Sequence, residues 1–482
     1  MGALKEERGA RKQTDGMPAG PFGSTSGVGR ADAPWDELNL VKTTVGEDAI
    51  AKSATSNGRD PEATPEEALA MVGRGEDGLS EETYDVIIVG AGLSGATMAE
   101  RLSKELDKKV LIIEKRDHIG GNCYDYVTEN GIRASKYGAH LFHTKHERVW
   151  EYVRRFSEWV PFDHRVRGRV KPTPESTEEL LVPIPPTQET VNALFGAGVK
   201  SEEDMEAWYA KERVFPEHGG ELANGEEAAL SRVGPRLYEA IFKHYTKKQW
   251  DKYPAELDAS VLMRLPCRTS TDDRYFSDPW QALPKHGYTR IFENMIGNNP
   301  NITVRVDCDF FEMKKKGTLP KHEFLVYTGQ IDSYYAALGM PQLEYRSLRF
   351  EEEYVEKTED GEFFQEAMVV NYPSSDVPFT RIVEYKHTPN QPAGRHEAPG
   401  TLIAREYSSA TGEPYYPVPN PENRALYEKY AEMAAKEPGV AFVGRLASYK
   451  YFNMDEAILN ALEMFDNLVE TGKLEPKRAI PK

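Results

Sequence analysis

The chain is poor in cysteine, with only Cys123, Cys267 and Cys308 among 482 residues. These three are scattered without the spacing of a metal site, and their odd number argues against a disulfide framework, as expected in a reducing compartment. The chain also lacks a run of about eighteen apolar residues, which could cross a membrane, and an apolar secretory segment near its N-terminus. We therefore expect a cytoplasmic protein that binds neither a metal nor a membrane.

Positive charge is in deficit, because 60 Lys and Arg residues stand against 78 Asp and Glu residues, for a formal net charge of −18. This balance disfavours a nucleic-acid surface, and an anionic substrate would need a local cluster of basic side chains. Large apolar residues are scarce over residues 1–82, which we expect to form a disordered extension. Residues 471–482 are expected to form a C-terminal tail.

The most informative stretch is residues 84–122. Continuous apolar runs at 86–89 and 110–113 predict strands buried on both faces, and the segment between them predicts a helix. The turn after the first strand reads G-x-G-x-x-G, with Gly90, Gly92 and Gly95, and Glu114 ends the second strand. Such glycines let a pyrophosphate sit on the helix N-terminus, and the carboxylate suits ribose hydroxyls. The unit therefore predicts a bound dinucleotide.

A second glycine turn favours FAD over NAD as that dinucleotide. Gly120 and Gly121 follow Arg116 in the arrangement R-x-x-x-G-G, which many FAD oxidoreductases use to wrap the same pyrophosphate, and Asn122 comes directly after them as a further candidate for a cofactor contact. Lys115, next to the ribose carboxylate, is a further candidate for a cofactor contact. The alternative is an ordinary glycine turn that leads into a hairpin.

A helix is predicted over residues 231–250, where Leu237, Ile241, Tyr245 and Gln249 recur at i+4 steps. Trp250 falls off that face at the helix end, where an aromatic ring can stack on a flat base. From the residues alone, core packing is the favoured role of both aromatic side chains. Residues 254–266 lack strong periodicity and are expected to form a loop.

Long motifs then follow one another along the chain: GIRASKYGAHLFHTKHERVWEYV at 131–153, LYEAIFKHYTKKQW at 237–250, DRYFSDPWQALPKHGYT at 273–289, LEYRSLRFE at 343–351 and VGRLASYKYFNMDEAI at 443–458. Together they resemble the bacterial-type UDP-galactopyranose mutases over nearly all of residues 84–470. The resemblance implies isomerisation of UDP-galactopyranose to UDP-galactofuranose by reduced, noncovalently bound FAD. It further implies that the flavin N5 attacks the sugar and expels UDP, with NAD(P)H as the external reductant.

The resemblance also assigns roles to site residues. It implies that His140 lies against the flavin ring, and that Arg264 and Arg346 hold the UDP diphosphate, these three being the catalytic side chains. Arg445 and Met454 belong to the last FAD-binding segment. The remaining substrate residues are His164, Tyr245 and Trp250 at the uridine, and Tyr275, Phe379, Tyr451 and Asn453 around the diphosphate and sugar.

Three positions depart from the family pattern. Ile241 replaces a bulky aromatic residue, Phe379 replaces a tyrosine and Asn453 replaces an aspartate. Without the resemblance, Arg264 and Arg346 could equally form surface ion pairs, and a histidine in the core would be the favoured reading of the GAH motif.

We expect an α/β fold with a Rossmann-like FAD-binding domain, a helical insertion and a mostly antiparallel sheet domain. The expected bounds are 83–158, 287–335 and 438–470 for the first, 186–255 for the second, and 159–185, 262–286 and 340–418 for the third. The rival functions are an FAD-dependent amine oxidase or desaturase, which would need an apolar substrate tunnel, and a flavin-binding protein that has lost catalysis. The oligomeric state stays open, with a homodimer as one option.

Overall fold

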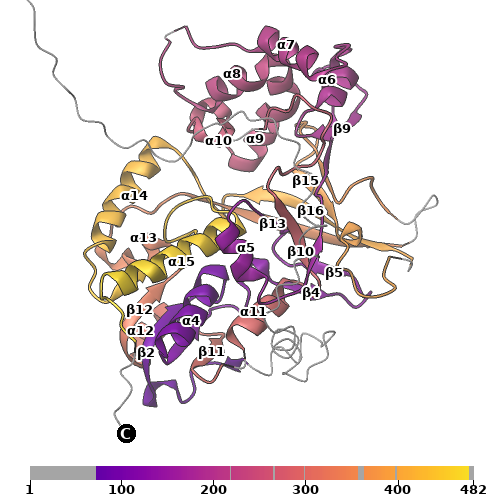
Figure 1. The fold of residues 1–482 in the computed structure, drawn as a ribbon. Coiled ribbons are helices and arrows are strands. Elements are labelled where there is room, and N and C mark those ends of the chain that lie inside the picture. Colours follow the sequence, from indigo (N-terminus) through magenta and orange to yellow (C-terminus); the bar gives the residue numbers. More distant parts are fainter. Residues whose placement is uncertain are drawn as a thin grey trace, which may run out of the picture. The chain divides into compact units, whose positions relative to one another are not determined.

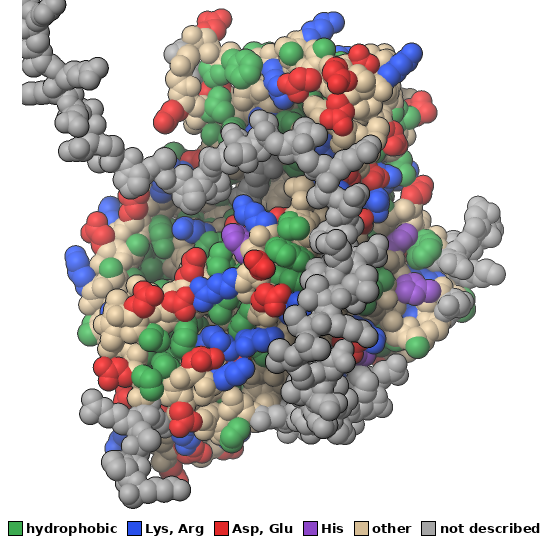
Figure 2. Space-filling view, in the orientation of Figure 1, with side chains coloured by type: hydrophobic (Ala, Val, Ile, Leu, Met, Phe, Trp, Pro, Cys, Tyr) green, Lys and Arg blue, Asp and Glu red, His purple; other side chains and the backbone are tan. Residues whose placement is uncertain are grey.

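The computed structural model describes residues 72–217, 219–263, 266–297, 299–356, 363–396 and 399–476. Most of the expected N-terminal extension, the end of the C-terminal tail and Arg264 lie outside these ranges. No helix within them is long and apolar enough to cross a membrane. On the face shown in Figure 2, acidic and basic side chains are interspersed, so the described part of this face does not gather charge of one sign into a single patch.

A six-stranded parallel sheet carries the first glycine turn. Its strand order is β1 (Gly73–Arg74), β11 (Ile302–Val306), β3 (Val110–Ile113), β2 (Thr83–Val89), β12 (Lys321–Tyr327) and β18 (Val440–Phe442). One face packs on α4 (Leu93–Leu106), which contacts α11 (Tyr288–Ile296) and α15 (Met454–Glu470) (Figure 1). On the other face, α12 (Phe310–Lys316) joins Ile87 and Leu111 in an apolar cluster. Because helices cover both faces, the predicted strands appear in the sequence as unbroken apolar runs.

Residues 72–82 differ from the expectation of a disordered extension. β1 pairs in parallel with β11, and Leu79 is fully buried in the same apolar cluster as Ile87. A strand of two residues is too short to show a periodic pattern, which is why the sequence does not reveal it.

A seven-stranded sheet forms the second layer and confirms the expected antiparallel architecture. Its order is β17 (Tyr416–Pro417), β13 (Tyr345–Val355), β16 (Thr401–Ser409), β15 (Arg381–Glu384), β14 (Val369–Asn371), β8 (Val166–Val170) and β9 (Leu180–Ile184). Neighbouring strands run antiparallel except β14 and β8, which are parallel. α14 (Pro421–Ala434) follows the last of these strands in the chain.

Two segments that we expected in this sheet pair elsewhere. β7 (Trp159–Pro161) and β10 (Trp280–Pro284) form a three-stranded sheet with β6 (Phe142–Thr144). Aromatic packing accounts for the difference, because Trp159 lies 4.9 Å from Phe142 between ring centroids and Trp280 stacks on Trp150 of α5 (Glu147–Val153). A separate hairpin joins β4 (Asp125–Val127) to β5 (Arg133–Ser135).

The helical part comprises α6 (Gln188–Phe195), α7 (Glu202–Glu212), α8 (Gly225–Leu237), α9 (Lys243–Trp250) and α10 (Ser260–Met263), which lie together in Figure 1. The predicted helix over 231–250 is interrupted twice. Gly234 has φ 76°, and a side chain there would meet the carbonyl oxygen of Glu212 at 2.4 Å. A π-helical turn then spans Tyr238–Phe242. Residues 254–266, expected to be a loop, contain a 3₁₀ turn at Pro254–Glu256 and α10.

One ammonium group ties α9 to the seven-stranded sheet. Lys248 Nζ donates to the backbone carbonyls of Ser374 at 2.8 Å, Val377 at 3.3 Å and Phe379 at 2.9 Å, and also to that of Tyr372. These carbonyls belong to the connection between β14 and β15. The side chain therefore fixes the helical part against the loop that follows Asn371.

We expect Lys248→Met to lower the free energy of unfolding by about 1–3 kcal/mol, because several partly buried carbonyls would lose their donor. Urea denaturation of the purified protein measures this. Lys247→Met is the matched control, since Lys247 bonds Asp251 at the exposed end of the same helix and should cost at most about 0.5 kcal/mol. Equal effects of the two substitutions would contradict the structural role of Lys248.

Candidate active site

A single cleft of about 1460 Å³ runs from the first glycine turn to the helical part. Gly90 and Gly92 line one end, and Tyr245 and Trp250 of α9 line the other. Pockets for one small ligand measure roughly 300–1,000 Å³. The cleft is therefore large enough for a dinucleotide together with a second ligand.

The two glycine turns meet at the dinucleotide end. Gly90 has φ 105°, and a Cβ at Gly95 would lie 2.0 Å from the Gly90 carbonyl oxygen, so only glycine lets α4 pack this close to β2. A Cβ at Gly121 would lie 2.9 Å from the Cα of Gly92. The backbones of both turns thus leave a bare surface at the N-terminus of α4, which suits a pyrophosphate.

Glu114 lies at the end of β3 with its carboxylate oriented by the backbone. It accepts hydrogen bonds from the N–H groups of Ala91 at 2.9 Å and Arg116 at 3.0 Å, and it lines the cleft. Asn122 accepts from the Arg116 guanidinium at 3.0 Å. Lys115 also lines the cleft, but its ammonium pairs with Glu413 at 2.8 Å.

His140 and Arg445 both line the cleft. The Nδ1 atom of His140 is 2.8 Å from the Gly138 carbonyl, so it carries the proton and leaves Nε2 as an acceptor. Desolvation by the surrounding protein lowers the pKa of His140 to about 4, so the ring is neutral at pH 7. Arg445 lies over the rings of Tyr416 and Tyr451, and its buried Nε finds no acceptor among the described residues. A bound dinucleotide could supply one.

The predicted helix start at Met454 is confirmed, since α15 begins there with Asn453 as its N-cap. The backbone N–H of Asn453 donates to Glu456 at 2.8 Å. Both Asn453 and Met454 line the cleft. The helix N-terminus therefore presents its partial positive charge to the cleft.

The far end of the cleft is aromatic. Trp250 is buried, with its ring centroid 6.2 Å from that of Tyr416 and 6.3 Å from that of Tyr451. Burial raises the pKa of Tyr245, so its phenol is protonated at pH 7. Burial lowers the pKa of His164 to about 3, and its Nδ1 has no partner in the described chain. The open ring nitrogen suits the polar edge of a flat base.

The π-helical turn supplies a residue that the sequence pattern did not identify. One extra residue in the turn lets both Ile241 and Phe242 line the cleft. The ring of Phe242 thus lies next to Ile241, which occupies the position where the family pattern has an aromatic residue. Because i+4 counting assumes a regular α-helix, only the presence of a second bulky residue after Ile241 could have indicated this.

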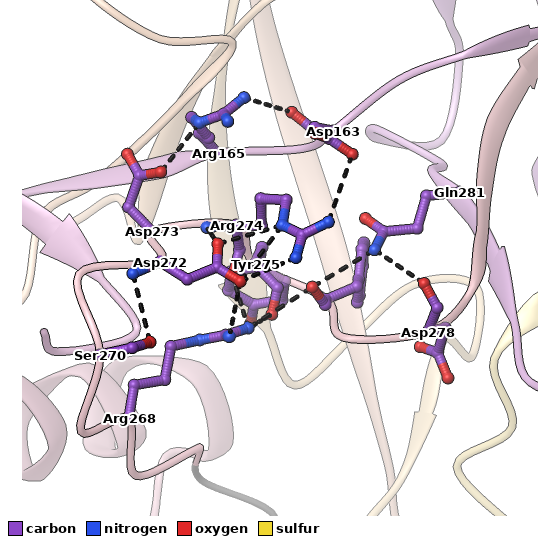
Figure 3. A network of polar contacts seen from close by, with 11 residues as sticks. Asp163, Arg165, Arg268, Ser270, Asp272, Asp273, Arg274, Tyr275, Asp278 and Gln281 are labelled. Carbon is purple, nitrogen blue, oxygen red and sulfur yellow. Dashed lines mark hydrogen bonds and ion pairs between the residues drawn. The ribbon is translucent and has the colours of Figure 1, made fainter. Parts of the chain in front are cut away.

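A polar network holds Tyr275 in the cleft wall (Figure 3). Arg268 donates to the carbonyls of Arg274 at 2.6 Å and of Tyr275 and Phe276 at 3.4 Å, and Arg274 pairs with Asp272 at 2.9 Å. The backbone N–H of Tyr275 donates to the His164 carbonyl at 2.7 Å. These contacts tie the loop around Tyr275 to the neighbouring chain.

The two expected diphosphate arginines and Phe379 are not among the described residues that line the cleft. Arg346 of β13 is buried behind Ser408, which lines the cleft and lies 3.0 Å from the Arg346 guanidinium. Arg264 is outside the described residues. The Phe379 ring packs on Tyr372, with centroids 4.8 Å apart, and is not part of the cleft wall.

Comparison with known proteins identifies the family. A family model described as UDP-galactopyranose mutase matches residues 240–451, and one for an NAD(P)-binding Rossmann-like domain matches 88–156. A probable UDP-galactopyranose mutase of Klebsiella pneumoniae is 37% identical over 395 residues, which cover 80% of this chain and 95% of that protein. The chain belongs to the UDP-galactopyranose mutase family.

Other relatives of the family agree with this placement. A UDP-galactopyranose mutase of Mycoplasma genitalium is 31% identical over 80% of this chain and 95% of its own length. A dTDP-fucopyranose mutase of Escherichia coli is 35% identical over 80% of this chain and 99% of its own. A crystal structure of reduced UDP-galactopyranose mutase superposes with a TM-score of 0.61 at 16% identity, covering 82% of this chain and 95% of that one, and it supports the fold.

Removal of the Glu114 carboxylate should weaken dinucleotide binding. Glu114→Ala loses a charged acceptor worth about 1.5–3 kcal/mol, so we expect the Kd to rise about 10- to 150-fold. Titration of the cofactor-depleted variant with FAD, and separately with NAD⁺, measures the change and tells which dinucleotide binds. Glu105→Ala is the control, because that exposed carboxylate of α4 pairs with Arg101 and should leave the Kd unchanged. An unaltered Kd in Glu114→Ala would mean that the ribose lies elsewhere.

Proposed function

We propose that this chain interconverts UDP-galactopyranose and UDP-galactofuranose with a reduced FAD in the cleft. The observation that carries the proposal is the continuity of one cavity from the double glycine turn to the aromatic end. Such a cavity would bring the ring of a bound dinucleotide and a nucleotide-sugar into contact. The family relationship supports the same reaction.

FAD fits the dinucleotide end, because the glycine turns leave room for its pyrophosphate and Arg445 Nε lacks an acceptor among the described residues. A reduced flavin would supply the nucleophilic nitrogen that ring contraction needs, and an external reductant such as NAD(P)H would keep it reduced. Cys123, Cys267 and Cys308 form no disulfide among the described residues, which is consistent with the proposed work in the cytoplasm.

The protein's own side chains would bind and orient the UDP part of the substrate and offset its negative charge. Trp250 and Tyr245 would stack on the uracil, and His164 would meet its polar edge. Arg346 is suited to the diphosphate, since its nearest carboxylate, Asp251, is 3.9 Å away and largely exposed. With Arg264 as a second anchor, these contacts would hold UDP in place when its bond to the anomeric carbon breaks and again when that bond re-forms.

In the sugar, the anomeric carbon loses UDP, the ring bond to O5 opens, O4 closes on the same carbon, and UDP returns. Neutral His140 would lie against the flavin as an acceptor, not as a competing cation. The hydroxyl groups of Tyr275 and Tyr451 would donate hydrogen bonds to the phosphate oxygens. Asn453 adds no negative charge there, so its departure from aspartate is compatible with activity.

An anaerobic assay tests the proposal. Enzyme reduced with dithionite should convert UDP-galactofuranose into UDP-galactopyranose, without consuming the reductant stoichiometrically. Chromatography of the two nucleotide-sugars measures the conversion. Oxidised enzyme should be inactive. Equal rates in both states would contradict a flavin nucleophile, and turnover of dTDP-fucopyranose alone would reassign the substrate. Oxygen consumption with an amine and no isomerisation would favour an amine oxidase.

Arg346→Ala should lose about 2–4 kcal/mol of transition-state stabilisation, or about 30- to 1,000-fold in kcat/KM, and should weaken UDP binding. Arg349→Ala is the matched control three residues along the same strand, where the guanidinium is exposed and pairs with Glu351. Isothermal titration with UDP and steady-state rates measure both. Wild-type UDP affinity in Arg346→Ala would remove this residue from the diphosphate site.

A further inference from the structure

The cleft contains a buried ion pair that the roles above do not use. Arg381 of β15 and Glu406 of β16 are cross-strand partners, and Arg381 Nε donates to Glu406 Oε2 at 2.6 Å. The Glu406 side chain is only 2% exposed, whereas that of Arg381 is 27% exposed. Both residues line the cleft. Glu406 therefore anchors the guanidinium from behind, and Arg381 is the member that a ligand can reach.

Two donor groups of Arg381 are open. Its terminal nitrogens make no hydrogen bond or ion pair within the described part of the chain, where only Nε is engaged. Although burial alone would lower the pKa of Arg381, Glu406, Tyr245 and Tyr416 raise it well above the usual value. The guanidinium thus stays charged, close to two phenols that line the same cleft.

The pair lies between the loop that carries His140 and the aromatic end of the cleft, where Arg381 interacts electrostatically with Tyr245. A Cβ at Gly138 would be 3.0 Å from the other Glu406 oxygen, Oε1, and the carbonyl of Gly138 fixes the ring of His140. Arg381 and Glu406 therefore adjoin the loop that carries His140. In the proposed reaction the sugar must occupy this part of the cleft, because its anomeric carbon has to reach the flavin.

The charge balance of Arg381 differs from that of Arg346. The Glu406 carboxylate offsets the Arg381 charge at 2.6 Å, whereas the nearest carboxylate of Arg346 is 3.9 Å away. A guanidinium already neutralised by a carboxylate gains little from a diphosphate, but keeps two directed N–H groups. Such groups in a fixed fork suit uncharged hydroxyl oxygens.

We propose that Arg381 binds hydroxyl groups of the sugar ring, with Glu406 as its positioning residue. This inference depends on the proposed function, because it names the contact for the sugar within that site. Arg346 serves the charged half of the substrate and Arg381 the uncharged half. Arg381 also orients the hydroxyl groups when O4 replaces O5 as the ring oxygen.

Binding of UDP and of UDP-galactose to the oxidised holoenzyme, which does not turn over, tests the assignment. In Arg381→Met we expect the Kd of UDP to change less than about twofold. The Kd of UDP-galactose should rise about 10- to 100-fold, with a similar loss of kcat/KM in the reduced enzyme. Glu406→Gln should shift the same ratio of affinities in the same direction, by less, because the amide still accepts from Arg381.

Two further variants guard against unfolding and charge effects. Arg381→Met combined with Glu406→Gln leaves no unpaired buried carboxylate and should give the same loss of sugar affinity if the single variant is insoluble. Arg405→Met is the matched control. Arg405 precedes Glu406 in β16 and pairs with the exposed Glu353, so its substitution should change neither affinity.

The outcomes separate the two proposals. Equal weakening of UDP and UDP-galactose would make Arg381 a phosphate or base ligand, and no change in either would make the pair structural; both results overturn the inference. If the unmodified holoenzyme binds neither compound, the proposed function fails instead.

Discussion

The close contact between two glycine turns is the constraint on which the cleft depends. Because a Cβ at Gly121 would reach within 2.9 Å of the Cα of Gly92, a side chain at Gly121 would force the two turns apart. The same contact sets the distance between the turn that follows β2 and the turn at Gly121. The close approach of the two backbones, and not any single polar contact, therefore defines where a dinucleotide would lie and where the rest of the cleft begins.

Charge within the cleft is controlled more tightly than the net charge of −18 suggests. Burial keeps His140 and His164 neutral, and Glu406 compensates Arg381. Arg346, which is buried behind Ser408, keeps a charge that no nearby carboxylate closely compensates. Neutral and compensated groups can meet uncharged parts of a substrate, whereas the helix N-terminus at the glycine turns and the Arg346 guanidinium each favour an anion.

Local patterns predicted the dinucleotide unit, because strand, turn, helix and acidic residue lie within about forty residues and each has its own signature. Other features depend on contacts that no local pattern records. The π-helical turn breaks the regular period on which the helix prediction depends, and Arg381 and Glu406 meet only through strand pairing. The roles of individual site residues came from the family resemblance and remain predictions.

The π-helical turn also has a consequence for how this segment can vary. A π-helical turn holds one residue more than an α-helical turn, so loss of a single residue between Tyr238 and Phe242 would restore a regular α-helix and leave α9 in register. The Lys248 ammonium would keep its carbonyls and Trp250 would keep Tyr451, but only one bulky side chain would remain where Ile241 and Phe242 now both line the cleft. Loss of a residue later in α9 would instead rotate every following side chain by about 100°, so this turn is the place where the helix can change length without dismantling the aromatic wall.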